Sequence, residues 1–334
     1  MIARYPRVAL ALIALASIAL VSITHWTGAS AYAQGASAKA KQAPMIMRKL
    51  TDSLYEIEGA GGNVVVYTTS EGVILVDDKN VGDANTNELL GLIKTVSDKP
   101  VKYVFITHYH ADHIGGNERF ARLGAQIISH ATTAENISGP VWKTVKVFDN
   151  DGKFLREQPY NPASAKGDWT PVAPSMVFTD ELRLTLGGKE VRARYLGPAH
   201  TGGDSFIFFP AERAIAVGDT MRPFCSICVD YHAGGSLIGD IKIMDGLLKL
   251  PGGKIDNLDD FDIVIPGHGD VSDRAGLLEH RNKLVKMRDL VIKLKRAGKS
   301  YGEIANVMMA EYQWKPEDRD LGQWTFPGMM KELK

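Results

Sequence analysis

The chain has 334 residues, enough for one large domain or two ordinary ones. Apolar residues make up 45% of the sequence, and 39 basic side chains balance 39 acidic ones. This composition excludes an intrinsically disordered protein, which would combine low hydrophobicity with high net charge. It also argues against a nucleic-acid partner, which would require a basic surface.

The first 33 residues have the layout of a secretory signal peptide. Two arginines precede an almost purely apolar run over residues 8–23, and Ala31 and Ala33 supply the small residues that a cleavage site needs. The run is shorter than the roughly 20 residues that span a bilayer, which favours cleavage over the alternative of an uncleaved anchor. We therefore expect a periplasmic or secreted protein without stable membrane insertion, in which residues 34–44 form a flexible linker.

Short β-branched runs separated by glycine-rich turns follow this linker. They predict an antiparallel meander with strands at Leu54–Glu58, Val64–Thr68 and residues 73–77. Apolar residues at helical spacing then predict an amphipathic helix over residues 84–96.

The sequence His-Tyr-His-Ala-Asp-His at 108–113 directly follows Val101–Ile106, an apolar run that indicates a buried strand. His108 and His110 alternate as on a strand and can face one point, while Asp112 and His113 turn toward a second. Imidazole is the commonest transition-metal ligand. This spacing therefore predicts two metal ions at the end of the strand, and a histidine-rich polar turn is the alternative.

Residues 136–175 differ from the segments around them. A short helix over 117–123 and a strand over 126–129 are expected before them, but from 136 onward no period of 2 or 3.6 persists among several prolines and scattered aromatic residues. We expect an irregular segment. Such segments in compact domains are often lids or binding loops, and an ordinary surface insertion fits the pattern equally well.

Strands are expected again at residues 182–186, 191–196, 206–209, 214–217 and 263–265. Three of these strands are followed by a glycine-rich turn that carries a potential metal ligand: His200, Asp219 or His268. Glycine at such turns lets the backbone approach a ligand closely. One such residue alone would carry little weight, but three in the same context as the histidine cluster indicate a shared site at the strand ends.

Cys225 and Cys228 are the two cysteines of the chain. One C-x-x-C pair is too small for a zinc ribbon, and its loop context differs from the helix start of a redox motif. An exported protein meets an oxidising compartment, so we expect a local disulfide, with a soft-metal site as the alternative.

Helices dominate the end of the sequence. They are predicted over residues 236–250 and over Arg274–Arg296, where long amphipathic patterns occur. Ser300 and Glu303 have the spacing of a capping box that opens a last helix.

Taken in order, these motifs resemble those of the metallo-β-lactamase-fold hydrolases over about residues 50–272. The resemblance implies an α/β fold, a four-layer αββα sandwich with the site at one edge of its two sheets. The catalytic domain would span residues 45–272, and residues 273–334 would form a helical extension packed on it. The ligands implied by the family are His108, His110 and His200 for one zinc ion, Asp112, His113 and His268 for the second, and Asp219 as the bridge.

The implied chemistry is hydrolysis. Two Zn²⁺ ions sharing a water lower its pKa to about 7, and the metal-bound hydroxide attacks a carbonyl group. Asp112 is the expected catalytic residue, because it can orient that hydroxide. We expect a small-molecule substrate, β-lactam-like or lactone-like.

Two departures from the family's β-lactamases bear on the substrate. Many of those enzymes carry Cys at the place of Asp219, whereas Asp there resembles the glyoxalase II and lactonase branches. Arg222, three residues further on, stands where a lysine grips the substrate carboxylate in the Cys-bearing enzymes, and a solvated loop arginine is the alternative. The alternative functions are an iron-dependent oxidoreductase of the same fold and a thioesterase of glyoxalase II type, since iron or mixed metals also suit these ligands. The oligomeric state stays open.

Overall fold

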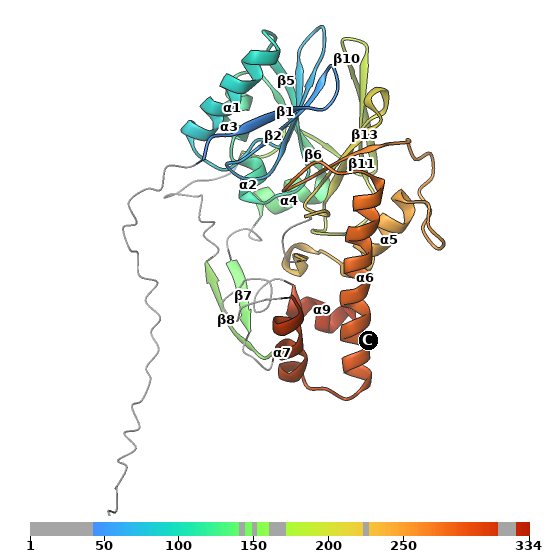
Figure 1. The fold of residues 1–334 in the computed structure, drawn as a ribbon. Coiled ribbons are helices and arrows are strands. Elements are labelled where there is room, and N and C mark those ends of the chain that lie inside the picture. The colour runs from blue at the N-terminus through green and yellow to red at the C-terminus, as the bar shows by residue number, and fades with distance from the viewer. Residues whose placement is uncertain (1–42, 140–143, 149–151, 160–171, 223–226, 313–324) are drawn as a thin grey trace, which may run out of the picture. The chain divides into compact units, whose positions relative to one another are not determined.

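Two large β-sheets with helices on their outer faces form the main body of the part of the protein that the structure describes (Figure 1). The computed structural model describes residues 43–139, 144–148, 152–159, 172–222, 227–312 and 325–334. The predicted signal peptide and nearly all of the predicted linker lie outside these residues. The layered arrangement confirms the predicted αββα sandwich.

The first sheet has seven strands in the order β1-β2-β3-β4-β5-β6-β9. Their bounds are β1 Ile46–Lys49, β2 Leu54–Glu58, β3 Val64–Thr68, β4 Val73–Val76, β5 Val101–Ile106, β6 Gln126–His130 and β9 Met176–Phe178. Strands β1 to β4 pair antiparallel, which confirms the predicted meander, and β4, β5, β6 and β9 run parallel. The associated helices are α1 Asp83–Val96, α2 Ala111–Ile114, α3 Asn117–Arg122 and α4 Ala131–Ser138.

The second sheet has five strands in chain order, and the predicted strands of this region are all present. Their bounds are β10 Glu181–Leu186, β11 Lys189–Tyr195, β12 Ser205–Phe209, β13 Ala214–Gly218 and β14 Ile263–Pro266. The last pair, β13 and β14, is parallel, so the ends of these two strands open onto the same edge of the sheet.

Three buried apolar clusters fill the spaces between the four layers. Strand β3 contributes to two of them: Val64 and Val66 join the cluster beneath α1, while Val65 and Tyr67 join the cluster between the sheets. Side chains alternate along a strand, so a strand that is buried on both faces reads as a continuous apolar run. This is why the strands of the inner layers are visible in the sequence.

Helices make up most of the C-terminal part of the chain, and their buried apolar residues share one cluster with residues of β12 and β13. The helices are α5 Leu237–Leu247, α6 Arg274–Arg296, α7 Tyr301–Tyr312 and α9 Phe326–Glu332. The predicted capping box opens α7, since the Ser300 amide donates to Glu303 at 2.8 Å and the Glu303 amide donates to the Ser300 hydroxyl at 3.3 Å. In the described part of the chain, no helix combines the length and apolarity needed to cross a membrane.

The prediction of an irregular segment over residues 136–175 is wrong in part. Strand β7, Thr144–Phe148, pairs antiparallel with β8, Phe154–Pro159, in a separate two-stranded sheet. The hairpin has a sequence signal in Asp151-Gly152, a pair that favours tight turns, but each strand is short and Pro159 hides the end of the second. Whether residues 136–175 form a lid stays a prediction.

Candidate metal centre

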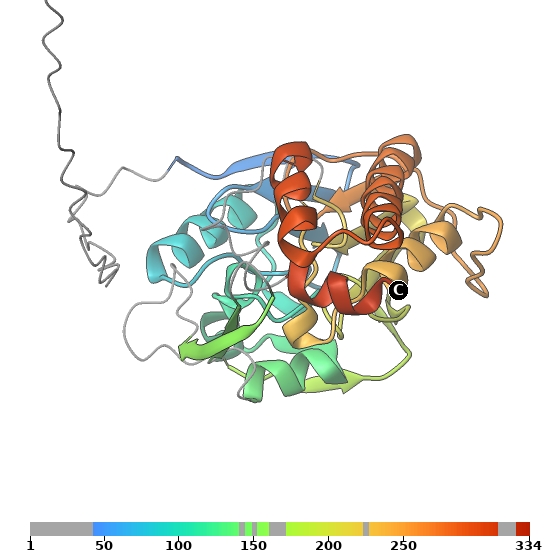
Figure 2. The ribbon, with the colours of Figure 1, turned by 90° about the horizontal axis from the view of Figure 1, so that it is seen from below.

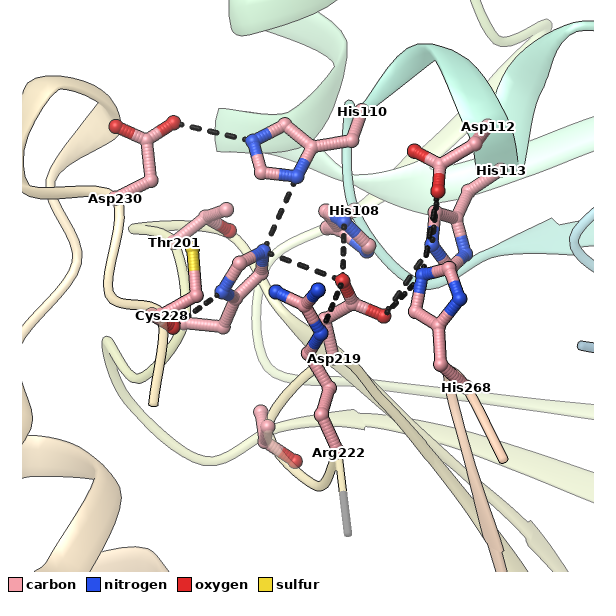
Figure 3. Close-up of polar contacts among 12 residues, drawn as sticks. His108, His110, Asp112, His113, Thr201, Asp219, Arg222, Cys228, Asp230 and His268 are labelled. Carbon is pink, nitrogen blue, oxygen red and sulfur yellow. Dashed lines mark hydrogen bonds and ion pairs between the residues drawn. The ribbon is translucent and has the colours of Figure 1, made fainter. Parts of the chain in front are cut away.

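All seven predicted ligands meet at one edge of the two sheets (Figure 3). The histidine cluster leaves β5, His200 follows β11, Asp219 follows β13 and His268 follows β14. The ligands form two groups in which the potential ligand atoms lie within 4.8 Å of one another. We call His108, His110 and His200 the first group and Asp112, His113 and His268 the second group; Asp219 clusters with the first.

Asp219 lies between the two groups with one carboxylate oxygen toward each. Its Oδ1 is 3.3 Å from Nε2 of His113 and 3.4 Å from Nε2 of His268. Its Oδ2 is 3.9 Å from Nε2 of His108 and 3.8 Å from Nε2 of His200. This is the arrangement that a carboxylate shared by two cations requires.

Buried atoms at the centre of the site fit a metal better than they fit the protein alone. Nε2 of His108, Nε2 of His113 and Oδ1 of Asp219 are buried and form no hydrogen bond within the described residues. A buried polar atom without a partner costs about 1–3 kcal/mol, so several facing one another need a common partner. Imidazole nitrogen and carboxylate oxygen are the donor types that suit divalent transition metals.

Hydrogen bonds fix the orientation of the first group. Nδ1 of His200 donates to the carbonyl oxygen of Cys228 at 2.8 Å, which leaves its Nε2 facing Nδ1 of His110 at 3.1 Å. Nε2 of His110 is held by Asp230 at 3.2 Å. In each imidazole, a hydrogen bond on one nitrogen turns the other into the site, as is usual for metal-ligating histidines.

Asp77 orients an imidazole of the second group by a hydrogen bond. Its Oδ2 lies 2.7 Å from Nδ1 of His113 and accepts from the Thr107 hydroxyl, also at 2.7 Å. Its Oδ1 accepts from the Thr107 amide at 2.8 Å. Asp77 therefore ties the end of β4 to the start of the histidine cluster and aims the Nε2 atom of His113 at Asp219.

Asn63 holds the turn that carries His268. Its side-chain amide donates to the carbonyl oxygens of Pro266 at 3.0 Å and Gly269 at 2.7 Å. Its backbone amide donates to the carbonyl oxygen of Gly267 at 2.7 Å. Three bonds from one residue of the first sheet thus fix a turn of the second.

Close packing excludes side chains at two glycines of the site. A Cβ atom on Gly267 would lie 2.0 Å from Oδ1 of Asp219, and one on Gly62 would lie 2.2 Å from Cε1 of His113. Both distances are far below contact, so only glycine allows the backbone to approach these ligands.

The two groups differ in their electrostatics. Burial, reinforced by neighbouring imidazoles, holds the pKa of His108 well below its usual value and lowers the pKa of His200 to about 3. Burial acts in the same direction on His113, but Asp219, Asp112 and Asp77 outweigh it and raise the pKa well above the usual value. His108 and His200 thus offer neutral imidazoles, and the carboxylates around His113 favour a cation at the second group.

Arg222 lies beside the carboxylate of Asp219. Its Nε atom is 3.7 Å from Oδ2 of Asp219, and only 13% of its side chain is exposed. Burial alone would raise the pKa of Asp219, but His268, His113 and Arg222 together hold it well below its usual value. The structure therefore places Arg222 at the metal centre, with a small part of its surface open.

Three residues that support the ligands were not identified from the sequence. Asp77 has a signal, because an acidic residue at the end of the apolar strand β4 is unusual. Asn63 and Asp230 carry no such signal, since they act through long-range contacts. Cys225 lies outside the described residues, so the predicted disulfide stays a prediction.

Comparison with known proteins agrees with this geometry. Residues 57–294 match the sequence profile described as the metallo-beta-lactamase superfamily. The chain is 28% identical over 229 residues to the metallo-beta-lactamase type 2 of Bacillus cereus, which covers 69% of this chain and 75% of that protein.

Solved structures share the fold. A metallo-beta-lactamase from Pontibacter korlensis has a TM-score of 0.53 at 20% identity, over 72% of this chain and 99% of that one. The sec-alkylsulfatase Pisa1 from Pseudomonas sp. has a TM-score of 0.58 at 14% identity, over 86% of this chain and 49% of that one. At these identities the likeness concerns the fold alone.

Proposed function

The chain belongs to the metallo-beta-lactamase superfamily and is a metal-dependent hydrolase, and from this premise we propose that it is an exported dinuclear zinc enzyme acting on a carbonyl substrate. The observation that carries the proposal is the position of Asp219, whose two oxygens face two separate groups of ligands. A single metal ion would leave one of these groups without a function.

The residues have distinct roles in this proposal. One ion would be held by His108, His110 and His200, the other by Asp112, His113 and His268, and Asp219 would serve both. When bound, the two ions would supply a water of lowered pKa as nucleophile and a positive charge for the carbonyl oxygen.

Asp112 is the residue best placed to orient the attacking water. Its Oδ2 atom lies 3.2 Å from Nε2 of His268, and 32% of its side chain is exposed, against 3% for Asp219. A carboxylate at the open side of the site can accept a hydrogen bond from the water while it contacts the metal.

A β-lactam-like or a lactone-like compound is the proposed substrate. We propose a β-lactam because of the similarity to the Bacillus cereus enzyme, and a lactone because of the aspartate at position 219. Export rests on the signal-peptide pattern of residues 1–33, and an intact mass that starts at Gln34 in the exported protein would confirm cleavage.

The proposal is tested by metal content and by one pair of variants. We expect two equivalents of zinc, loss of hydrolysis of β-lactams or lactones in a chelator, and recovery on adding zinc. Asp219→Ala should abolish activity and weaken both metal sites, because it removes the shared ligand. Metal analysis of protein purified without added metal separates zinc from iron, and thereby the hydrolase from an oxidoreductase of the same fold.

Asp204→Ala is the matched control. Asp204 is also buried near the site, but its carboxylate accepts from the amide and hydroxyl of Thr201, at 2.7 and 2.8 Å. It supports the loop of His200 without facing a metal, so we expect a loss of roughly 10- to 100-fold. A stoichiometry of one, or an equal loss in both variants, would contradict the dinuclear proposal.

A further inference from the structure

We propose that Thr325 and Glu332 are positioning residues for the first group of metal ligands, although they lie some distance beyond the part of the chain that matches the family, residues 57–294. The inference rests on the proposed function, because it concerns the ions that the first group would hold. We call residues 325–333 the C-terminal clamp and residues 228–236 the orienting segment. The clamp fixes the orienting segment, and the orienting segment fixes two imidazoles.

The orienting segment holds both His110 and His200. The carbonyl oxygen of Cys228 accepts from Nδ1 of His200, and the carboxylate of Asp230 holds Nε2 of His110. The backbone amide of Asp230 also donates to the carbonyl oxygen of His200 at 2.7 Å. A shift of this segment would therefore turn two ligands of one metal ion at once.

Thr325 contacts the residue between these two supports. Its hydroxyl accepts from the amide of Val229 at 2.9 Å and donates to the carbonyl oxygen of Val229 at 3.2 Å. Thr325 and Val229 are both almost completely buried. One threonine thus bonds both backbone groups of Val229, whose carbonyl oxygen also accepts from the Tyr231 amide at 3.1 Å, and it fixes the peptides on either side.

Glu332 fixes the far end of the orienting segment. Its carboxylate accepts from the hydroxyl of Ser236, from the hydroxyl of Tyr231 at 2.6 Å and from the amide of Leu237 at 3.1 Å. Leu237 begins α5, so the negative charge also lies at the positive end of that helix. The packing is close, because a Cβ atom on Gly328 would lie 2.0 Å from the ring of Tyr231.

Apolar burial anchors the clamp in the outer core. Phe326, Met329 and Leu333 are buried in the same cluster as the α6 residues Leu284 and Val291. Figure 2 shows the red C-terminal helix beside the orange helix α6 and the yellow-to-orange segment that contains the orienting residues. The polar contacts of Thr325 and Glu332 are therefore made from a rigid base.

The second group is supported from elsewhere. His113 is held by Asp77, and the turn of His268 is held by Asn63, both from the first sheet. Among the hydrogen bonds of the described residues, those of Thr325 and Glu332 reach the orienting segment and the start of α5, not these supports. Loss of the clamp should therefore weaken one metal site and leave the other.

The test measures the affinity of each site separately in the full-length protein. Thr325→Val keeps the shape and removes the hydroxyl, and Thr325→Ser restores the hydroxyl. Each is made in a His268→Ala background, which isolates the first group, and in a His110→Ala background, which isolates the second. Zinc affinity is read by competition with a chromophoric chelator, and the visible spectrum of the Co²⁺ form reports ligand geometry.

We expect Thr325→Val to weaken zinc binding by the first group by about tenfold and to alter its Co²⁺ spectrum. Loss of a direct partner of a ligand typically costs about 10- to 100-fold, and Thr325 acts one step further out, through Val229. Thr325→Ser should restore most of the affinity, and the second group should not change. Val291→Ala is the control, because it removes buried volume from the same outer core without removing a hydrogen bond to the orienting segment. It should lower the melting temperature and leave both affinities unchanged.

Equal weakening of both sites by Thr325→Val, or no weakening at the first group, overturns the inference. If Thr325→Val does not fold, Glu332→Gln replaces it, since it keeps size and removes the charge. A protein with intact Thr325 that binds no zinc through the first group refutes the proposed function instead, so the two failures are distinguishable.

Discussion

At the scale of single residues, the candidate metal centre is defined by which nitrogen of each imidazole faces its middle. The sequence identifies the histidines, but the hydrogen bonds decide their orientation. Carbonyl and carboxylate partners occupy Nδ1 of His200, Nδ1 of His113 and Nε2 of His110. Each bond leaves the opposite nitrogen for a metal, so the imidazoles do not have to reorganise when an ion binds.

The geometry is compatible with two roles for Arg222. We propose that it reads a substrate carboxylate, as the motif suggests, because 13% of its side chain stays exposed beside the candidate metal centre. Its position 3.7 Å from Asp219 offers the other explanation, in which it steadies the bridge.

Kinetics on two kinds of substrate separate these explanations. We expect Arg222→Ala to raise KM for substrates that carry a carboxylate by roughly 10- to 150-fold, since a hydrogen bond to a charged group contributes about 1.5–3 kcal/mol. Arg222→Lys should recover part of this loss, because lysine keeps the charge and loses the planar fork. Neutral esters should be hydrolysed as before. An equal loss of activity with neutral and anionic substrates would show that Arg222 steadies the Asp219 carboxylate and does not read the substrate.

At the scale of elements, the fold could be predicted wherever burial forces a regular pattern. Strands β3 and β4 are buried on both faces, so their sequences are continuous apolar runs. β1 was missed because it is a short edge strand with an exposed Ile46. The hairpin β7–β8 was missed because proline obscures the alternation of its short strands.

The sequence predicted which seven candidate ligands lie together, and it did not predict the residues that orient them. His108, His200 and His268 occur in motifs whose spacing is local. Asp230 and Thr325 act on residues about 100 positions away in sequence, and nothing in the neighbouring residues marks such a contact. Asp230 lies in the segment between β13 and α5, and Thr325 directly precedes α9, so only the folded chain brings either residue to its partner.

Helix α6 also makes a contact between residues distant in sequence, through a histidine whose protonation changes with pH. It buries His280, which is hydrogen-bonded to the backbone of Thr220, the residue after Asp219. Burial, with a contribution from Lys283, lowers the pKa of His280 to about 4.

The folded protein should therefore lose stability in mild acid. Below about pH 6.5 the unfolded chain binds a proton at this histidine, whereas the folded protein does so only near pH 4. Neutral His280 therefore makes its full contribution to the free energy of unfolding above pH 6.5. This contribution falls by about 3 kcal/mol at most as the pH falls to 4. Urea unfolding of metal-free wild type and His280→Gln should show that their difference in stability shifts in favour of the variant between pH 7 and 4.5. A difference that is constant with pH would contradict this.

At the scale of the whole molecule, the metal centre joins the two sheets. The ligands of residues 108–113 leave the first sheet, while His200, Asp219 and His268 leave the second. A cluster of apolar side chains such as Phe105 and Ile207 holds the sheets together beneath the site. The ions would therefore bind an arrangement that exists only in the folded protein, and their binding energy would add to its stability.

Zinc should accordingly raise the melting temperature in a concentration-dependent way. A ligand that binds only the folded state adds about 2.7 kcal/mol per site at a concentration of 100 Kd. Each kcal/mol corresponds to roughly 2–4 °C in a domain of this size class, so calorimetry should show a rise of roughly 5–10 °C per site. Mg²⁺ is the matched control, because it prefers oxygen ligands in octahedral geometry and should produce no comparable rise. Asp219→Ala should reduce the zinc effect at both sites, since it removes the ligand that the two groups share. A melting temperature independent of zinc would mean that these ligands hold no ion in the folded protein, however well their arrangement suits one.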